Sequence, residues 1–467
     1  MTPLRVAVLG GGPAGLSTAL AVARAGHRVF LVERDPVEVT SGEEAFFWPR
    51  KGVAHFLLPH AFNPRGRREM RTHLPDVYTA LLDAGAEELD LRRRLTGPSR
   101  PGDEDLVYLG VRRPLIEWAL RKAVLAQPEI QLLPHTRLIG LLGDSQRVEG
   151  ARTEQGELRA DLVVDALGRT SPAPAWLAEI GASPPALETS DCAVLYYTRY
   201  YRVRDGETLP DGPWIPTPRG ILQYCLFSSF PGDNRTFGAL LAILPQDSEL
   251  KILRRVDAFE AAVAAMPSLD SWTSRSEPIT DVLAMGSIQN SLRRYRSGPG
   301  RGVPGFVPVG DALCHTNPMF ALGLTQSLIH AFALATALAD ASRLEDVAEA
   351  YHPAVEPESV ERFRLATECD QARGRWWRGE PVDFFHRSGA RELFLLAAGG
   401  ATALEDPDIF RAHVRRLGFL DRTAVLDDDD ALQHRMEIRF AELRASGPPP
   451  LGPPTREELL ARLPTEP

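Results

Sequence analysis

The chain has 467 residues and a formal net charge of −9, from 53 Lys and Arg against 62 Asp and Glu. A composition of 44% hydrophobic and 25% charged residues is ordinary for a globular protein and excludes gross disorder or collagen-like repeats. The acidic balance, without a basic tail, argues against nucleic-acid binding, which requires neutralisation of phosphate charge. Four widely spaced cysteines form no CxxC motif, so neither a disulfide scaffold nor a metal site is predicted.

The first 35 residues predict a βαβ unit. An apolar run at residues 4–9 suits a buried parallel strand, residues 14–26 form an Ala/Leu-rich helix that ends at glycine, and residues 28–32 suit a second strand. A glycine-rich turn separates the first strand from the helix, and an acidic residue closes the second strand. This combination is typical of dinucleotide-binding domains.

The glycine-rich turn has the GxGxxG spacing. Gly10 permits a tight turn, Gly12 lets the backbone approach a pyrophosphate, and Gly15 lets the helix pack closely on the strand. The helix N-terminus then faces the phosphates, and Glu33 can accept hydrogen bonds from a ribose diol. Arg34, directly after the ribose acid, is a further candidate for cofactor contact.

Less regular segments follow this unit. Residues 36–105 are rich in Pro, Gly and Arg, with one helix predicted near 77–84. A helix is predicted next at residues 113–127, and three strands follow at residues 130–133, 137–142 and 160–165. Alternating, aromatic-rich segments between residues 193 and 244 predict an antiparallel sheet.

The final third returns to the first pattern and then becomes helical. A strand and turn at residues 305–310 precede a long helix. The predicted fold class is therefore α/β, with a Rossmann-like nucleotide-binding domain assembled from separated segments, an inserted antiparallel-sheet domain and a helical C-terminal region. The predicted boundaries are 1–175 and 290–342 for the nucleotide-binding domain, 176–289 for the inserted substrate domain, and 343–467 for the helical region, with a Pro-rich linker at 446–454.

Three ordered segments resemble those of a known superfamily. They are GGGPAGLSTALAVARAGHRVFLVERD near the start, ADLVVDALGRTS in the middle and VGDALCHTNPMFALGLTQSLIHA near residue 310. They are similar to the FAD-dependent monooxygenases of the aromatic-hydroxylase and epoxidase superfamily. The stretches PRKGVAHFLLPHA, RRPLIEWALR, WLAEIGA and DPDIFRAHVRRLGFL resemble a bacterial branch that includes polyether-pathway epoxidases.

The resemblance implies FAD as the cofactor. Asp311 is expected to bind the FAD ribityl chain, and the backbone at Gly323 and Leu324 to lie against the isoalloxazine ring. Pro318 and Gly323–Leu324 are expected to open the long helix, whose N-terminus can face the anionic flavin O2 region. The superfamily pattern PxxGxG is broken here, because Ala321 replaces its first glycine.

Other cofactor contacts are expected at the start of an RxxLxxxLR-type helix and in the DALG turn. The complete set of residues expected to hold FAD is Gly10, Gly12, Pro13, Ala14, Gly15, Glu33, Arg34, Arg113, Leu138, Ala166, Gly168, Gly310, Asp311, Pro318, Gly323 and Leu324. Two histidines are weak catalytic candidates: His55, which closes a GxxH segment similar to that branch, and His315, four residues after Asp311. Ordinary loop packing is the alternative for both.

By resemblance, the chain is expected to be an FAD-dependent monooxygenase that inserts one oxygen atom, by epoxidation or hydroxylation, into an organic secondary metabolite through a flavin C4a-hydroperoxide. A small-molecule substrate and O2 are the expected partners. Because no second GxGxxG is present, either NAD(P)H or a partner flavin reductase is expected to supply electrons. Neither a signal peptide nor a membrane span is predicted, and a cytoplasmic location is expected. The substrate pocket is expected to come from residues 36–105 and 190–290.

Three alternatives stay open. A flavin-dependent halogenase shares the scaffold, and residues 214–216 match part of the halogenase WxWxIP signature, although the earlier Trp and the halogenase lysine motif are missing. An isoprenoid-type flavin reductase would also share the scaffold and would work without O2. The third alternative is a non-catalytic, FAD-bound partner protein.

Overall fold

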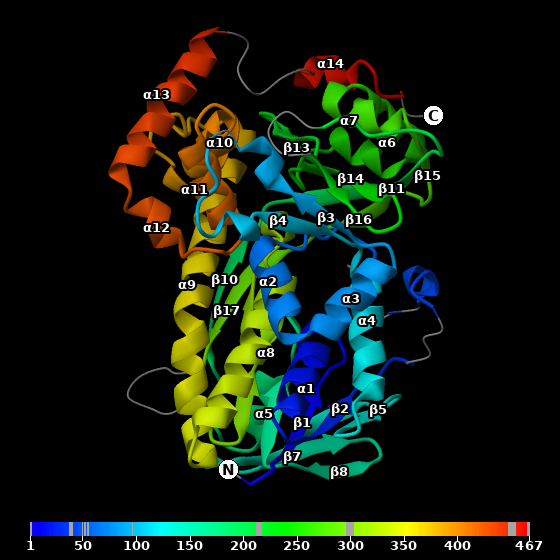
Figure 1. Ribbon diagram of the computed structural model, residues 1–467, viewed down its shortest axis with the longest axis vertical. Coiled ribbons are helices and arrows are strands. Elements are labelled where there is room, and N and C mark those ends of the chain that lie inside the picture. Colours follow the sequence, from blue (N-terminus) through cyan, green and yellow to red (C-terminus); the bar gives the residue numbers. More distant parts are fainter. Residues whose placement is uncertain are drawn as a thin grey trace.

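The computed structural model describes residues 2–36, 41–48, 50, 53, 56–95, 97–211, 217–295, 303–446 and 454–464. These residues form one parallel sheet, a set of antiparallel sheets and a helical C-terminal region (Figure 1). The predicted fold class is confirmed.

A five-stranded parallel sheet carries the nucleotide-binding motif, with strand order β18-β9-β1-β2-β5. Its strands are β1 (Arg5–Leu9), β2 (Arg28–Val32), β5 (Ile130–Leu133), β9 (Leu162–Asp165) and β18 (Phe306–Pro308). The last four residues of β1 are fully buried, which explains why the strand is a continuous apolar run. Because its neighbours come from distant stretches of the chain, the sheet closes only when these stretches meet.

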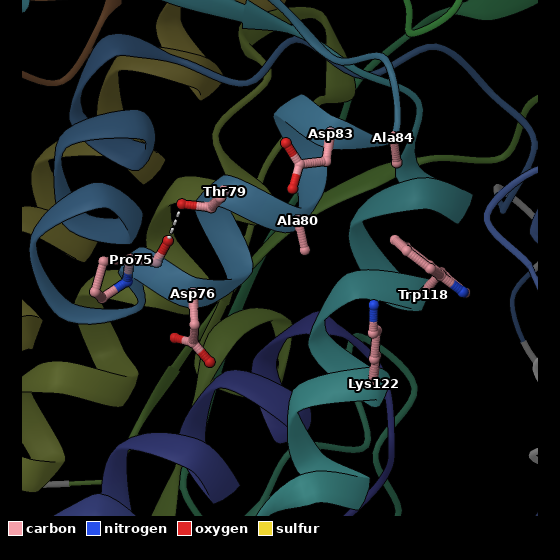
Figure 2. A pocket seen from close by; sticks show the side chains of 8 residues that line it. All are labelled: Pro75, Asp76, Thr79, Ala80, Asp83, Ala84, Trp118 and Lys122. Atoms are coloured by element: carbon pink, nitrogen blue, oxygen red, sulfur yellow. Dashed lines mark hydrogen bonds between the residues drawn. The ribbon is translucent and has the colours of Figure 1, made fainter.

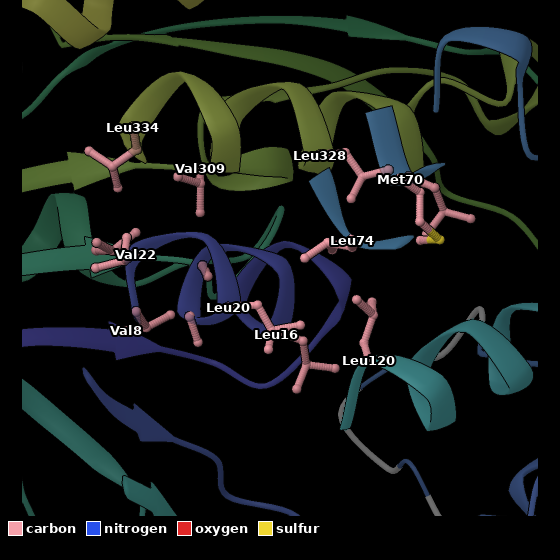
Figure 3. Packing of buried hydrophobic residues seen from close by; sticks show 14 of the residues in the cluster. Val8, Leu16, Leu20, Val22, Met70, Leu74, Leu120, Val309, Leu328 and Leu334 are labelled. Atoms are coloured by element: carbon pink, nitrogen blue, oxygen red, sulfur yellow. The ribbon is translucent and has the colours of Figure 1, made fainter. Parts of the chain in front are cut away.

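Helices pack on this sheet through a shared apolar core. Its main helices are α1 (Pro13–Arg24), α4 (Arg113–Ala126) and α8 (Gly323–Asp340). Figure 3 shows Leu16 and Leu20 of α1 in one cluster with Leu328 of α8 and Leu120 of α4, and all four are at most 2% exposed. Burial of each such side chain stabilises the fold by about 1.5–3 kcal/mol. The core therefore fixes α1 and α8 against each other, with their N-termini at the same edge of the sheet.

The second large sheet is antiparallel, with order β12-β13-β14-β11-β15 and β16 paired to β11. Its strands are β11 (Leu195–Val203), β12 (Arg219–Ile221), β13 (Cys225–Pro231), β14 (Thr236–Ile243), β15 (Ser276–Pro278) and β16 (Leu283–Met285). Tyr197 and Tyr201 pack in the cluster that includes α6 (Val256–Ala264) and α7 (Pro267–Thr273), whereas Tyr196 lies in a different cluster. Tyr196 and Tyr197 therefore lie on opposite faces of this sheet.

A narrow three-stranded sheet connects the two large sheets. Strand β10 (Ala186–Asp191) pairs with β17 (Gln289–Arg294), which pairs with β19 (Cys314–His315). Strand β17 crosses the end predicted for the insert, residue 289. Its pairing with β10 therefore joins the predicted insert, 176–289, by hydrogen bonds to the residues that follow it. The domain boundaries themselves stay a prediction.

Among the described residues after 343, the regular secondary structure is helical, and loops or turns connect the helices. The helices are α9 (Leu344–Trp377), α10 (Arg391–Thr402), α11 (Pro407–Leu417), α12 (Thr423–Asp427), α13 (Asp430–Ser446) and α14 (Arg456–Leu460). The long α9 runs from the parallel-sheet region to the bundle of α10–α13, while α14 lies against the antiparallel-sheet region (Figure 1). Thr455 and Glu458 form a capping box at the start of α14. No helix within the described ranges has the length and apolarity that crossing a membrane requires.

Two local predictions were wrong. The helix α2 (Pro64–His73) was not predicted, because its sequence PRGRREMRTH buries only Pro64, Gly66, Arg67 and Met70 and shows no apolar period. Pro318 does not open α8: it begins a separate 3-10 turn, Pro318–Phe320, and α8 starts at Gly323. The left-handed backbone at Ala321, with φ 51°, separates the turn from the helix.

The remaining elements complete the fold. The helix predicted near 77–84 is α3 (Pro75–Asp83), which confirms that prediction within one or two residues. An antiparallel strand pair lies near the antiparallel-sheet region (Figure 1), and a three-stranded sheet packs on the parallel sheet. They and one further helix are β3 (Glu87–Asp90), β4 (Val107–Gly110), β6 (Leu138–Gly143), β7 (Val148–Thr153), β8 (Gly156–Arg159) and α5 (Ala173–Glu179).

Candidate active site

A cavity of about 1310 Å³ joins the nucleotide motif to the antiparallel sheet and the C-terminal helices. Its walls include the glycine-rich turn, the ends of β2 and β9, the loop before α8, the sheet strands β11–β14, and helices α10 and α13. Typical ligand pockets measure about 300–1,000 Å³. This cavity therefore has room for a second ligand beside a dinucleotide.

The glycine-rich turn shapes one end of the cavity. Gly10 has a φ of 107°, which favours glycine, and a Cβ added at Gly15 would lie 1.8 Å from the Gly10 carbonyl oxygen. A Cβ added at Gly12 would meet no atom within 4 Å, so the backbone there borders open space. Helix α1 begins at this point without an acidic residue in its first turn. The turn therefore offers free backbone and a positive helix end to an anion.

Glu33, at the end of β2, is held in place by three donors. Its carboxylate accepts hydrogen bonds from the Gly11 amide at 3.2 Å, the Asp35 amide at 3.0 Å and Arg50 Nη1 at 2.9 Å. Burial by itself would raise the pKa of Glu33, but Arg50 and these hydrogen bonds lower it below its ordinary value. The carboxylate is thus ionised and oriented toward the cavity that it lines, as recognition of a ribose diol requires.

A buried group of charges surrounds Glu33. Arg50 Nε lies 3.4 Å from Glu117 Oε2, Arg113 Nε donates to Glu117 Oε1 at 2.8 Å, and Arg121 Nη2 lies 3.7 Å from Glu33. Arg113 is only 7% exposed, so it is not a solvent-facing residue at a helix start. Arg50 lies in the stretch PRKGVAHFLLPHA, but sequence reasoning did not assign it to the site, because nothing in that stretch identifies it as the partner of Glu33.

The DALG turn after β9 forms another part of the same wall. Asp165 is fully buried and accepts hydrogen bonds from the Leu167 amide at 3.0 Å and Ser171 Oγ at 2.7 Å. Burial raises the pKa of Asp165. The turn ends at Gly168, which has a φ of 78° and where an added Cβ would meet no atom within 4 Å. Asp165 therefore fixes a turn whose last residue borders open space in the cavity.

The strand end at β18 places Asp311 and His315 side by side. His315 Nδ1 lies 3.0 Å from Asp311 Oδ2, and both residues line the cavity. Gly310 has a φ of 57°, and an added Cβ would lie 2.8 Å from Ala14 Cβ, so this turn packs directly on the start of α1. The other candidate histidine, His55, lies outside the described residues.

The loop before α8 is fixed from behind by a buried polar network. The Asn317 side chain donates from Nδ2 to Asp370 Oδ1 at 2.7 Å, and its backbone N–H donates to Asn290 Oδ1 at 2.7 Å. Arg373 Nη1 donates to Asp370 Oδ1 at 2.6 Å, and the Tyr196 hydroxyl donates to Asn317 Oδ1 at 2.5 Å. All five residues are at most 2% exposed. Helix α9 and two sheets thereby set the position of Asn317, the residue directly before Pro318.

The opposite wall of the cavity is apolar. The antiparallel sheet contributes Leu226, Phe230 and Leu240, and the loop after β19 contributes Met319 and Phe320. Helices α10 and α13 and the segments on either side of α10 add a set of side chains that sequence reasoning missed: Phe384, Phe385, Leu393, Leu396, Ala397, Leu404, Phe440 and Leu443. Their spacing in the sequence is that of ordinary core helices, so no pattern distinguishes them as cavity residues.

Every residue predicted to hold FAD lines this cavity except Gly15 and Gly310. Those two pack the turns on which the lining residues lie. The open space at Gly12 and Gly168, the ionised Glu33 and the free α1 terminus fit a dinucleotide. The assignment of each residue to an FAD atom stays a prediction.

A second, open groove of about 640 Å³ lies between α3 and α4 (Figure 2). Asp76 and Asp83 border it on one side, with Trp118 and Lys122 on the other. None of the residues that line it also lines the large cavity. Within the described residues, no group of three or more His, Cys, Asp or Glu side chains has the arrangement of a metal site.

The fold and this site together define the class of protein. The chain has the fold of solved FAD-dependent monooxygenases, and its N-terminal third matches a family of FAD-dependent oxidoreductases. The model of the family described as FAD dependent oxidoreductase matches residues 5–171, which include the glycine-rich turn, Glu33 and the DALG turn. The resemblance stated from the sequence is confirmed at this level.

The chain is also similar to individual proteins. Protein Rv3254 of Mycobacterium tuberculosis is 25% identical over 94% of this chain and 95% of its own length. A glycine oxidase of Pseudomonas aeruginosa is 29% identical over 41% of this chain and 62% of its own. Among solved structures, PqsL, a probable FAD-dependent monooxygenase of P. aeruginosa, has a TM-score of 0.58 at 15% identity and covers 81% of this chain and 99% of its own. The flavin-dependent brominase Bmp2 has a TM-score of 0.61 at 17% identity over 96% of this chain and all of its own.

Proposed function

We propose that this protein is a monooxygenase that uses FAD and O2 to insert one oxygen atom, by epoxidation or hydroxylation, into an organic secondary metabolite. The observation that carries the proposal is the single cavity that runs from the nucleotide motif to an apolar chamber. The apolar chamber provides the water-poor space that suits oxygen transfer to an apolar carbon. Neighbours with this fold include the monooxygenase PqsL.

In this proposal each wall of the cavity has a task. The α1 terminus and Gly12 hold the pyrophosphate, Glu33 holds the ribose, and Asp311 holds the ribityl chain. Bound FAD supplies the chemistry that activates oxygen. The apolar side chains of the sheet and of α10 and α13 exclude water and orient the substrate, and His315, beside Asp311, is the candidate for a polar contact at the reacting end.

The source of electrons is part of the proposal. NAD(P)H reduces the flavin directly, or a partner flavin reductase supplies it, and stopped-flow reduction of the purified holoprotein by NAD(P)H distinguishes these routes. Reduction on the timescale of turnover indicates the direct route. Reduction that requires an added flavin reductase indicates the partner route.

The deciding experiment is oxygen transfer under 18O2. Purified protein with FAD, a reductant and candidate metabolites from its genomic neighbourhood is expected to release product that carries one 18O atom. Product formation that depends on bromide or chloride would instead indicate a halogenase, and turnover without O2 would indicate a flavin reductase. Bound FAD without turnover would indicate a non-catalytic flavoprotein. Of the described lysines, Lys122 and Lys251, neither lines the cavity.

A further inference from the structure

The antiparallel sheet presents one polar row to the apolar chamber. Arg219 of β12 lies opposite Ser228 of β13, and Ser228 lies opposite Leu240 of β14. Leu240 in turn lies opposite Thr198 of β11. Directly opposed residues of antiparallel strands share one face of the sheet, so these four side chains lie on the same face. All four line the cavity. Arg219 is the cation at the end of this row.

The neighbouring row on the same face is apolar. Ile221 lies opposite Leu226, while Tyr196 lies opposite Met285, and all four line the cavity. Tyr196 also donates to Asn317, so this side of the sheet lies at the loop expected to face the flavin ring. Three strand spacings separate β11 from β12, which is about 14 Å. A molecule held at Arg219 therefore has an apolar path of about that length toward the loop.

The surroundings of Arg219 include polar side chains. Arg219 Nη2 lies 3.4 Å from Thr217 Oγ1, and Tyr108 of β4 also lines the cavity, near enough to Arg219 for the two groups to interact electrostatically. Burial lowers the pKa of Arg219 to about 10, so the guanidinium stays charged at neutral pH. Burial also lowers the pKa of the nearby His413 to about 3, and Arg416 and Arg219 add to that effect. Arg219 therefore places a positive charge at this end of the chamber.

We propose that Arg219, with the hydroxyls of Ser228 and Tyr108, forms a carboxylate-binding subsite that selects elongated, apolar substrates with an acid group at one end. Thr198, whose Oγ1 is buried and has no hydrogen-bond partner among the described residues, gives the chamber a second polar contact midway along the sheet. An acid group that docks at Arg219 leaves the far end of the molecule at the loop before α8. This proposal rests on the proposed function, because it assumes that the apolar chamber is where the substrate binds.

Binding of paired probes to the FAD-loaded protein tests this subsite without turnover. The pairs are dodecanoate with dodecan-1-ol and 4-phenylbenzoate with 4-phenylbenzyl alcohol, and binding is measured by titration calorimetry and by perturbation of the flavin spectrum. Wild-type protein is expected to bind at least one acid about tenfold or more tightly than its alcohol, because a charge-assisted hydrogen bond in a water-poor site is strong. Arg219→Gln is expected to remove this preference and leave alcohol binding within about twofold.

Two further variants complete the design. Arg219→Lys is expected to keep part of the preference, since it keeps the charge and loses the planar fork. Arg202→Gln, on the exposed part of β11 in the same sheet, is the matched control and is expected to change nothing. Unchanged FAD content in Arg219→Gln establishes that this variant is folded.

The subsite is overturned if neither acid binds, if acids and alcohols bind equally, or if the preference survives in Arg219→Gln. Failure of the proposed function gives a different result, in which the acid preference is present but no substrate takes up 18O. The reverse result, oxygen transfer without an acid preference, removes the subsite and leaves the monooxygenase proposal standing.

Discussion

At the scale of single residues, Ala321 stands where the superfamily pattern has glycine and adopts the backbone that glycine favours. Its φ of 51° and ψ of 37° lie in the left-handed region, where a Cβ costs about 1–2 kcal/mol. Ala321→Gly removes that cost but gives the unfolded chain more freedom, which offsets about 0.4–1 kcal/mol. We expect a net stabilisation of about 0.5 kcal/mol in denaturant unfolding.

The control for this prediction lies in the next helix. Ala335→Gly, inside α8 with ordinary helical backbone, is expected to destabilise the protein by about 1 kcal/mol. Equal destabilisation by both substitutions would contradict the strained conformation of Ala321.

Glu33 gives a prediction for cofactor affinity. The pKa of Glu33 in the folded protein lies below the ordinary 4.5. The stability that its ionised form gives to the fold is therefore fully present above pH 4.5 and is lost only as the pH falls through the lower folded value. At pH 7, Glu33→Gln is therefore expected to weaken FAD binding by about tenfold or more, since it loses a charge-assisted hydrogen bond. Quenching of FAD fluorescence by the apoprotein measures this change. Glu129→Gln, exposed before β5, should bind FAD like the wild type.

Asp370 gives a prediction for stability. Asp370→Asn leaves the buried Arg373 without its anionic partner and turns an amide toward Asn290 Nδ2, which donates to Asp370 in the native protein. Loss of one partner from a buried pair costs about 3–5 kcal/mol. Unfolding in urea should show this loss, and the visible circular dichroism of bound flavin should change, because Asn317 loses its anchor.

The matched control for Asp370 lies on the same helix. Glu368→Gln breaks an exposed pair with Arg364 on α9 and is expected to cost about 0.5 kcal/mol or less. A comparable loss in both variants, or an unchanged flavin signal in Asp370→Asn, would exclude a role of the network in positioning the loop.

At the scale of elements, the short helix α14 depends on tertiary contacts. Leu459 is fully buried in the core of the antiparallel-sheet region, and the Tyr224 hydroxyl donates to the Pro454 carbonyl at 2.8 Å. A five-residue helix is not stable by itself, so its packing must hold it. Leu459→Ala, which costs about 2–5 kcal/mol at a buried leucine, should therefore release α14.

Hydrogen exchange measures the release of α14. Amides in residues 454–464 are expected to lose protection in Leu459→Ala, while those of β1 and α1 keep theirs. Glu457→Ala, on the same helix and exposed, should leave the pattern unchanged. Loss of protection throughout the chain would show instead that α14 unfolds only with the whole protein.

At the scale of the whole molecule, the predicted FAD site is built from turns after β1, β2, β9 and β18 and from the start of α8. A ligand bound across all of these segments stabilises the folded chain by about 2.7 kcal/mol at a concentration of 100 times its Kd. The apoprotein should therefore melt at a lower temperature than the holoprotein, and FAD titration should raise the transition continuously. Two transitions, of which only one responds to FAD, would contradict a site that spans the molecule.

The sequence by itself determined the βαβ unit, the glycine-rich turn, Glu33 and the fold class, because these depend on local periodicity and short fixed spacings. It also marked Asp311 and the DALG turn, since each directly follows an apolar strand. The helix α2 was not predicted, because its few buried residues give no apolar periodicity. The sequence showed that Ala321 departs from the superfamily pattern, but it did not show the left-handed backbone of that residue.

Only the tertiary structure decided which of the many arginines matter and what encloses the chamber. Arg50 meets Glu33, Arg373 meets Asp370, and Arg219 enters an apolar cavity through contacts that no sequence interval encodes. The walls contributed by α10 and α13 come from segments far along the chain from the nucleotide motif. Their side chains meet that motif only after folding, because the burial of apolar surface, and not local pattern, brings such distant segments together.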